Sequence, residues 1–162
     1  MIDAIIPLYA LNLDYARRLV ADLPEEKMAF QPVPGALMNH AAWVIGHLAR
    51  TTDFTGQQMG LPPVTPATWA DLFGGASKPD AAPGKYPGKA VLLKTLEVGH
   101  ARVAAALVKV DAAFLSQVTA DEKRRARFPT MGAMLLHMCL GHEQVHLGQL
   151  SAWRRAQKLP AV

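Results

Sequence analysis

Two histidines near the C-terminus have the spacing of a metal-binding pair. His142 and His146 lie in the string HEQVH at residues 142–146. On an α-helix, residues four apart lie one turn apart on the same face, so both imidazoles can reach a single ion. Two ligands do not complete a metal site, and a third must come from another segment.

The HExxH string is also typical of zinc proteases, in which Glu143 would act as the general base. The extended form HExxHxxGxxH does not fit, because the glycine comes one residue early, at Gly148, and Ala152 replaces the later histidine. An acidic third ligand downstream does not fit either, since residues 147–162 contain no Asp or Glu. The protease is therefore the weaker alternative, and the third ligand is expected upstream.

The upstream candidate is His47, in the string WVIGHL at residues 43–48. Helical spacing places it on one stripe with Trp43, and Gly46 beside it would allow another helix to approach closely. Together with the downstream pair it would make a three-histidine site. Three neutral imidazoles leave coordination positions open, as catalytic metal sites do. Imidazole ligation suits Zn, Ni, Co or Fe, and we expect Zn or Ni.

Two polar residues beside the pair leave several roles open. Glu143 could act as a base on a metal-bound water, orient a ligand, or face solvent. Gln149 could form a hydrogen bond near the site or be a surface amide.

The cysteine and the other histidines have structural explanations. Cys139 lies on the same face as His142, but a buried free cysteine usually acts as a small hydrophobic residue. His40 lies near a helix start, where capping or exposure is expected. His100 lies on an apolar stripe. It is expected to be either a core histidine whose hydrogen bonds are satisfied or a polar group that lines a cleft. His137 is predicted to be structural, on a different face from His142.

Helices must position these side chains. Ala and Leu occupy 47 of the 162 positions, against 16 for Val and Ile, and this balance favours helices over sheets. The length suits one domain. We therefore expect a single all-α domain over residues 1–162.

Apolar residues at helical spacing predict four long helices. The predicted ranges are 2–23, 39–59, 89–110 and 131–157. Asn39 and Thr130 are the expected N-caps of the second and fourth helices. Pro7 allows a kink or a late start in the first helix.

The connection between the second and third helices is long and rich in proline. Residues 61–88 hold six of the twelve prolines and four glycines, so only residues 68–73 are expected to form a helical turn. Such a connection is either functional or a crossover between helices that are not antiparallel neighbours. The expected architecture is a four-helix bundle with a long Pro-rich crossover loop.

Charge and hydropathy exclude several classes of protein. The net charge of +4 is mild, and Asp121 and Glu122 dilute the basic run at residues 123–127, which we expect to be a solvated loop. We therefore expect no nucleic-acid partner. One cysteine excludes an internal disulfide. No segment predicts a signal peptide or a membrane span, so a cytoplasmic protein without a membrane partner is expected. An exposed apolar helix face would make a homodimer unsurprising.

The two histidine strings and the string FPTMG at residues 128–132 resemble the DinB-like four-helix-bundle superfamily of metal-dependent enzymes. The resemblance covers nearly the whole chain, and the pair Gly148-Gln149 fits the usual continuation of the superfamily's second histidine. It implies that His47, His142 and His146 bind a divalent metal. The superfamily includes thiol-dependent S-transferases and isomerases that use thiols such as bacillithiol or mycothiol.

The resemblance implies an enzyme that activates a low-molecular-weight thiol or water. Coordination lowers the pKa of either group. A thiolate would attack an electrophilic substrate, whereas activated water would give hydrolysis. The resemblance favours thiol transfer. The alternatives are a non-catalytic metal-binding stress-response module and a hydrolase or protease that uses His142-Glu143-x-x-His146.

Overall fold

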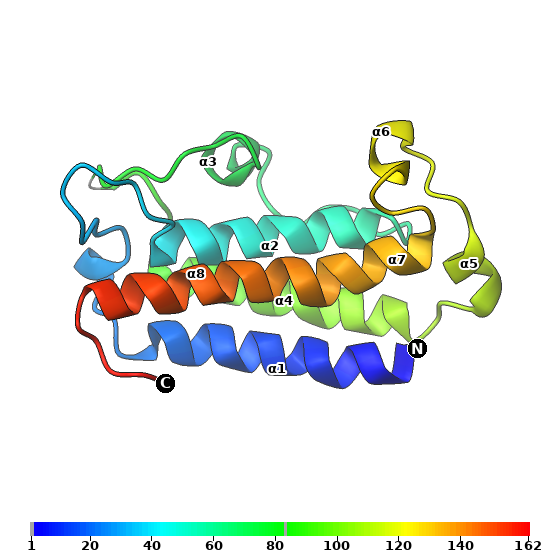
Figure 1. The fold of residues 1–162 in the computed structure, drawn as a ribbon, viewed down its shortest axis with the longest axis horizontal. Helices are drawn as coiled ribbons and strands as arrows, with labels where there is room; N and C mark the ends of the chain where they lie inside the picture. The colour runs from blue at the N-terminus through cyan, green and yellow to red at the C-terminus, as the bar shows by residue number, and fades with distance from the viewer. Residues whose placement is uncertain (1, 83) are drawn as a thin grey trace.

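The computed structural model describes residues 2–82 and 84–162, and the regular structure within these ranges is helical, with no strand. The all-α prediction is confirmed. Four long helices lie side by side (Figure 1). They are α1 (Ile2–Ala21), α2 (Ala41–Gln57), α4 (Lys89–Leu107) and a last helix made of α7 (Met131–Leu136), a π-helical segment (His137–His142) and α8 (Glu143–Ala156). The short helices are a 3-10 turn (Glu25–Lys27), α3 (Trp69–Phe73), α5 (Ala112–Ser116) and α6 (Glu122–Arg125).

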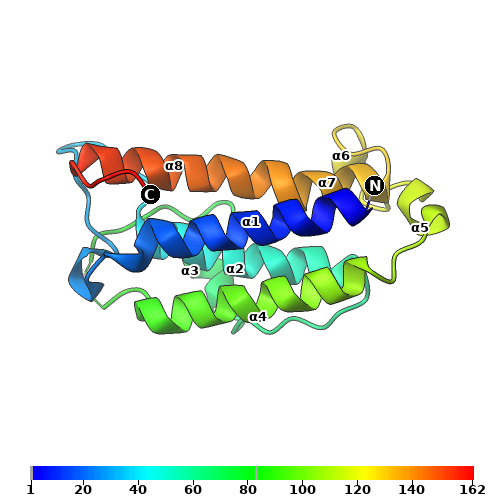
Figure 2. The same ribbon diagram turned by 90° about the horizontal axis from the view of Figure 1, so that it is seen from below.

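In cross-section, the four long helices lie at the corners of a square. Each of α1 and α2 contacts both α4 and α8, so α1 and α2 lie at opposite corners (Figure 2). The colours of α2 and α4 advance in the same direction in both views, so these two neighbours are parallel. The chain between them must therefore return along the bundle, and α3 lies on this return path.

Side-chain contacts decide where the second helix begins. His40, not Asn39, is the N-cap of α2, and its Nδ1 accepts a hydrogen bond from the Trp43 backbone N–H at 3.2 Å. The prediction of Asn39 as the N-cap is wrong, because its side-chain amide donates instead to Gln149 Oε1 of α8 at 2.8 Å. His40 is fully buried, so capping, and not exposure, is its role.

The other helix boundaries follow the predictions with small differences. α1 begins at Ile2 and continues through Pro7, so a late start is wrong. The predicted Thr130 N-cap is confirmed, because its hydroxyl accepts from the Ala133 N–H at 3.2 Å. Each long helix ends one to three residues before its predicted end, as fraying last turns do.

Two glycines allow close packing around α2. A Cβ on Gly99 of α4 would lie 1.9 Å from the Thr52 hydroxyl of α2, so these helices approach at this point. A Cβ on Gly46 would lie 2.2 Å from the ring of Phe73, so the close approach predicted at Gly46 is made by α3. Phe73 is fully buried in the larger core cluster. Gly46 thus brings α3 against the segment of α2 that carries His47.

Two features of the surface bear on partners. None of the described helices combines the length and the apolar character that a membrane span requires. Leu8 and Leu11 of α1 are exposed, and a homodimer stays a prediction.

Candidate metal centre

The structure brings together the three histidines that the sequence analysis selected. One ligand atom from each of His47, His142 and His146 lies within 4.8 Å of the other two. His47 comes from α2, His142 ends the π-helical segment and His146 lies one turn later in α8. Two helices that are distant in the sequence therefore bring their histidines into one cluster.

The spacing within the cluster fits a metal ion. The Nε2 atoms of His47 and His142 are 3.2 Å apart. Two imidazole nitrogens bound to one tetrahedral Zn²⁺ at about 2.1 Å would lie roughly 3.4 Å apart. A set of three nitrogen donors also suits Zn, Ni, Co or Fe. The residues present therefore fit a divalent transition-metal ion.

Hydrogen bonds on the far side of two rings direct them toward the cluster. His47 donates its Nδ1–H to the Phe73 carbonyl at 2.7 Å, and His146 donates its Nδ1–H to Gln149 Oε1 at 2.9 Å. Both acceptors lack a proton, so they fix the tautomer and leave each Nε2 free as a ligand. Gln149 thus forms the hydrogen bond near the site that was one of its two predicted roles. The Nδ1 atom of His142 is buried and has no partner among the described residues.

All three imidazoles are held in the neutral form that binds metals. Burial is the largest cause, and it lowers the pKa of His142 to about 3 and that of His146 to about 4. The neighbouring imidazoles lower both values further. Burial also lowers the pKa of His47. Since protons compete with metal ions for these nitrogens, neutral rings favour metal binding at physiological pH.

A π-helical segment shapes the approach to the cluster. A π-turn contains one residue more than an α-turn, so residues five apart come onto the same side. The ring centroids of His137 and His142 are accordingly 6.1 Å apart. The prediction that His137 faces away from His142 is wrong for this reason.

Trp43 supports His47 from within α2. Its ring is stacked on the His47 ring, with centroids 4.7 Å apart and planes 6° apart. The indole N–H donates to the Ser77 hydroxyl at 2.9 Å, and this hydroxyl donates to the Gly74 carbonyl at 2.7 Å. The segment after α3 therefore fixes both the indole and, through it, the orientation of His47.

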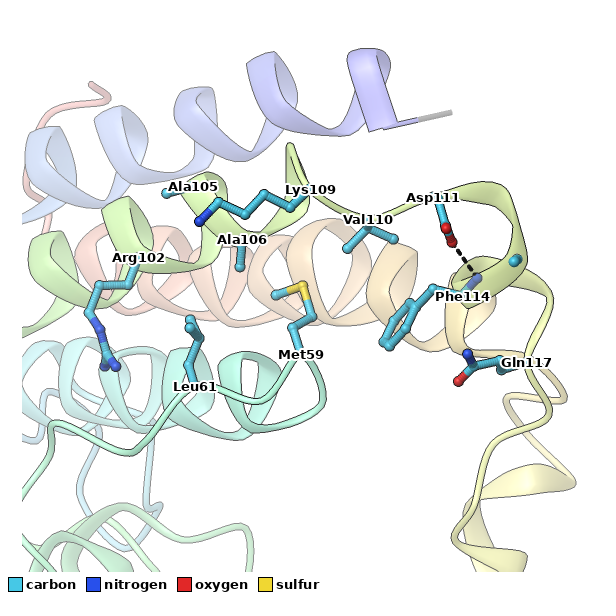
Figure 3. Close-up of a pocket in the computed structure, with 11 residues that line it drawn as sticks. Met59, Leu61, Arg102, Ala105, Ala106, Lys109, Val110, Asp111, Phe114 and Gln117 are labelled. Carbon is cyan, nitrogen blue, oxygen red and sulfur yellow. Dashed lines mark hydrogen bonds between the residues drawn. The ribbon is translucent and has the colours of Figure 1, made fainter.

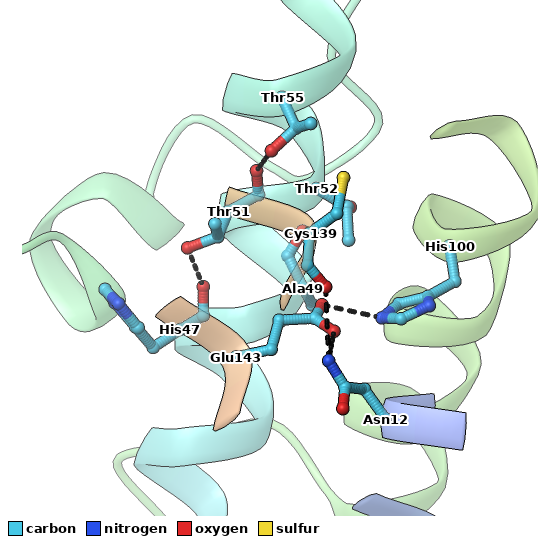
Figure 4. A network of polar contacts seen from close by, with 9 residues as sticks. All are labelled: Asn12, His47, Ala49, Thr51, Thr52, Thr55, His100, Cys139 and Glu143. Carbon is cyan, nitrogen blue, oxygen red and sulfur yellow. Dashed lines mark hydrogen bonds and ion pairs between the residues drawn. The ribbon is translucent and has the colours of Figure 1, made fainter. Parts of the chain in front are cut away.

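Glu143 lies in a separate buried network (Figure 4). Its carboxylate accepts hydrogen bonds from Asn12 at 3.2 Å and from His100 Nε2 at 2.8 Å, on the side away from the His47 ring. Burial raises the pKa of Glu143, and these two hydrogen bonds oppose the rise. Glu143 is 2% exposed, so facing solvent is wrong. A catalytic role for it stays a prediction.

The same network explains two further polar residues. His100 is a satisfied core histidine, as predicted, and it stacks on Tyr9 with ring centroids 3.8 Å apart. Asn12 also donates to the Cys139 carbonyl at 3.1 Å. Sequence reasoning missed the role of Asn12, although its place on the apolar stripe of α1 was the available clue. Such a residue needs a buried partner.

Cys139 is excluded as a ligand by its position. It is buried in an apolar cluster with Ile5 and Leu135 and is not part of the three-histidine group. Burial, with a smaller contribution from the charge of Glu143, raises the pKa of its thiol to about 12. The cysteine is therefore an inert core residue, as predicted.

One cavity adjoins the cluster and another lies away from it. A cavity of 390 Å³ is lined by His47, His137 and His142. A larger cavity of 680 Å³ lies among α4, α5 and the end of α2, with Met59 and Phe114 on its walls, and none of the three clustered histidines lines it (Figure 3). The smaller cavity is therefore the one that reaches two of the three clustered histidines.

Comparison with known proteins supports the same assignment. The model of the DinB superfamily matches residues 8–150, a range that includes all three histidines, the whole of α2 and α4, and most of α1 and of the last helix. No curated protein matches the chain. Because the family model covers most of the sequence, the chain belongs to the DinB superfamily.

Proposed function

We propose that the protein is a divalent-metal-dependent enzyme that transfers a low-molecular-weight thiol to an electrophilic substrate. The observation that carries this proposal is the convergence of three neutral imidazoles beside a cavity. Three protein ligands leave a position for an exogenous group, whereas a structural zinc site has four. Membership of the DinB superfamily supports a metal-dependent enzyme.

Each histidine has a definite part in this proposal. His47, His142 and His146 supply the nitrogen donors, and the bonds to Phe73 and Gln149 keep two of them aimed at one point. A divalent ion at that point supplies Lewis acidity, which lowers the pKa of a thiol or water in the cavity. The cavity keeps the activated sulfur and the electrophile in contact while the new carbon–sulfur bond forms and the leaving group departs.

The contacts of Glu143 and Cys139 favour an external thiol over the alternatives. A protease of the HExxH type needs its glutamate as a general base, but the Glu143 carboxylate is engaged by Asn12 and His100. Cys139 is buried with a pKa of about 12, so the chain offers no thiol of its own. The nucleophile must therefore come from solution.

A thiol screen of the metal-loaded protein tests the proposal. Bacillithiol, mycothiol and cysteine would each be combined with 1-chloro-2,4-dinitrobenzene, and thioether formation would be followed by absorbance. We expect turnover with at least one thiol, its loss in His142→Ala, and its retention in the control Arg155→Gln, which alters an exposed residue outside both the cluster and the cavity.

Two outcomes would overturn thiol transfer. Hydrolysis of a nitrophenyl ester without any thiol turnover would favour the hydrolase alternative. Full metal occupancy without either reaction would favour the non-catalytic module.

A further inference from the structure

The cavity beside the histidines is strongly cationic. Four basic side chains and no Asp or Glu line it. Arg50 comes from α2, one turn after His47, and Lys123 and Arg124 come from α6. Arg127 follows α6 in the chain. The cavity thus combines candidate metal ligands with an excess of positive charge.

Three of these four cations form no ion pair among the described residues. Arg124 forms an ion pair with Asp121 at 3.2 Å and lies over the Phe54 ring at 4.2 Å. Across residues 2–82 and 84–162, no acidic group pairs with Arg50, Lys123 or Arg127. Cations that converge without an internal partner attract an external anion.

The chain holds this basic run in a defined conformation. Asp121 caps α6 by accepting from the Lys123 N–H at 3.0 Å. The Arg125 side chain donates to the Thr119 carbonyl at 3.0 Å, which ties α6 to the segment before it. Both views place α6 beside α7, whose end carries the π-helical segment (Figure 1). The run is exposed, as the predicted solvated loop would be, but residues 122–125 form a short helix, and Lys123, Arg124 and Arg127 line the cavity.

We propose that this cavity binds a small organic molecule that carries two carboxylates, with Arg50 and Arg127 as its principal contacts. The inference rests on the proposed function in that the molecule is one of the two reactants, the thiol or the electrophile. A planar guanidinium matches a carboxylate through two parallel hydrogen bonds. A volume of 390 Å³ suits a small metabolite. Phe54 and Phe128 also line the cavity, and Arg124 and Arg127 lie over their rings.

The distribution of the basic side chains also argues against a nucleic acid as the ligand. A polymer needs cations spread along an open face so that several phosphates are contacted at once. Here four basic side chains line one cavity of 390 Å³ together with His47 and His142. The arrangement is suited to a compact dianion.

Binding of succinate tests the proposal without any reaction. The full chain would be titrated by calorimetry in metal-loaded and metal-free forms, with succinate and with its neutral diamide, succinamide. We expect succinate to bind both forms and to weaken as salt is raised. Succinamide is expected to bind at least about ten-fold more weakly, because charge-assisted hydrogen bonds are lost.

Variants identify the contacts. Arg50→Gln and Arg127→Gln are each expected to weaken succinate binding about ten-fold or more. Arg155→Gln, at an exposed position in the last turn of α8, is the matched control and should leave binding unchanged. Arg50→Lys keeps the charge and should retain more affinity than Arg50→Gln. If Arg50→Gln does not fold, Arg127→Gln, at an exposed position, provides the test by itself.

Mercaptosuccinate and 2-mercaptoethanol distinguish the two reactants. If the thiol is the dianion, mercaptosuccinate should outperform 2-mercaptoethanol in the metal-loaded protein, and succinate should inhibit it competitively. If the electrophile is the dianion, the two thiols should perform alike when bromosuccinate is the electrophile, and succinate should compete with bromosuccinate.

The inference and the proposed function can fail separately. Equal binding of succinate and succinamide, or unchanged affinity in the arginine variants, would overturn the anion site even if metal and thiol turnover are found. Tighter binding of a single-stranded oligonucleotide, lost in the same variants, would also overturn it. Succinate binding without any metal uptake would leave the anion site standing while the metal-dependent function fails.

Discussion

Gly46 lies where α3 comes closest to α2, and its replacement by alanine is expected to disturb both packing and metal binding. The new Cβ would lie 2.2 to 2.5 Å from three carbons of the Phe73 ring. Carbon atoms in contact normally lie about 3.5 to 4.0 Å apart, so the ring must move by more than about 1 Å. Phe73 is fully buried and packs on Trp69 with ring centroids 4.9 Å apart. The ring therefore has little space into which it can move.

The expected magnitude is a difference between two opposing effects. Overpacking of a core typically costs about 1 to 3 kcal/mol. Alanine gains up to about 1 kcal/mol over glycine inside a helix. We expect Gly46→Ala to lower the free energy of unfolding by about 1 kcal/mol, within a range of roughly 0 to 2 kcal/mol. Gly148→Ala is the matched control, because a Cβ there meets nothing within 4 Å, and it should stabilise the protein.

The same substitution should weaken the metal site. Phe73 accepts the Nδ1–H bond that orients His47, and loss of such a partner typically costs about 10- to 100-fold in metal affinity. Urea unfolding would measure stability, and competition with a chelator would measure Zn²⁺ affinity. If Gly46→Ala is as stable as Gly148→Ala and binds Zn²⁺ as tightly, the proposed coupling between α3 and His47 is refuted.

Three further predictions concern buried groups. Burial lowers the pKa of His40 from its ordinary 6.5 to about 4, so below pH 6.5 the unfolded chain binds a proton that the folded chain excludes. The free energy of unfolding should therefore fall by roughly 3 kcal/mol as the pH is lowered from 6.5 to about 4. His40→Asn keeps a capping acceptor and should show a flatter pH dependence in urea titrations. Identical curves for the two proteins would contradict this. Glu143→Ala leaves the donors of Asn12 and His100 unpaired and should cost about 3 kcal/mol, with Glu143→Gln costing less; equal unfolding midpoints for the two variants would argue against it. Cys139 should react with a maleimide only after denaturation, since it is 1% exposed with a pKa of about 12, and rapid labelling of the native protein would disprove its burial.

The local part of the metal site could be predicted from sequence because helical spacing decides it. Residues four apart on a helix share a face whatever the rest of the fold does, so His142 and His146 were paired correctly. His47 could be proposed only because a third ligand was required and because its string resembled a known superfamily. The packing of α2 against α8 then brings it within reach.

The features that were missed depend on contacts between distant segments. Asn39 and His40 can both accept the capping hydrogen bond, and the choice between them is made by Gln149 on another helix. The π-helical segment is a change of hydrogen-bond register that no residue type specifies, and it moved His137 next to His142.

The charge pattern of the sequence does not show which cavity or surface a basic run lies beside. The basic run at residues 123–127 is a solvated loop by composition alone. Only the turn through α6 places three of its cations on the wall of the cavity that His47 and His142 also line. Its meaning therefore depends on tertiary structure rather than on composition.

The metal content of the purified protein tests the central claim most directly. Elemental analysis after incubation with Zn²⁺ or Ni²⁺ and removal of unbound ions should find about one ion per chain. Alanine at His47, His142 or His146 should abolish retention while circular dichroism still reports a folded helical protein, and His137→Ala should retain the ion. Absence of metal from the wild-type chain, or unchanged metal content in His47→Ala, would contradict the account.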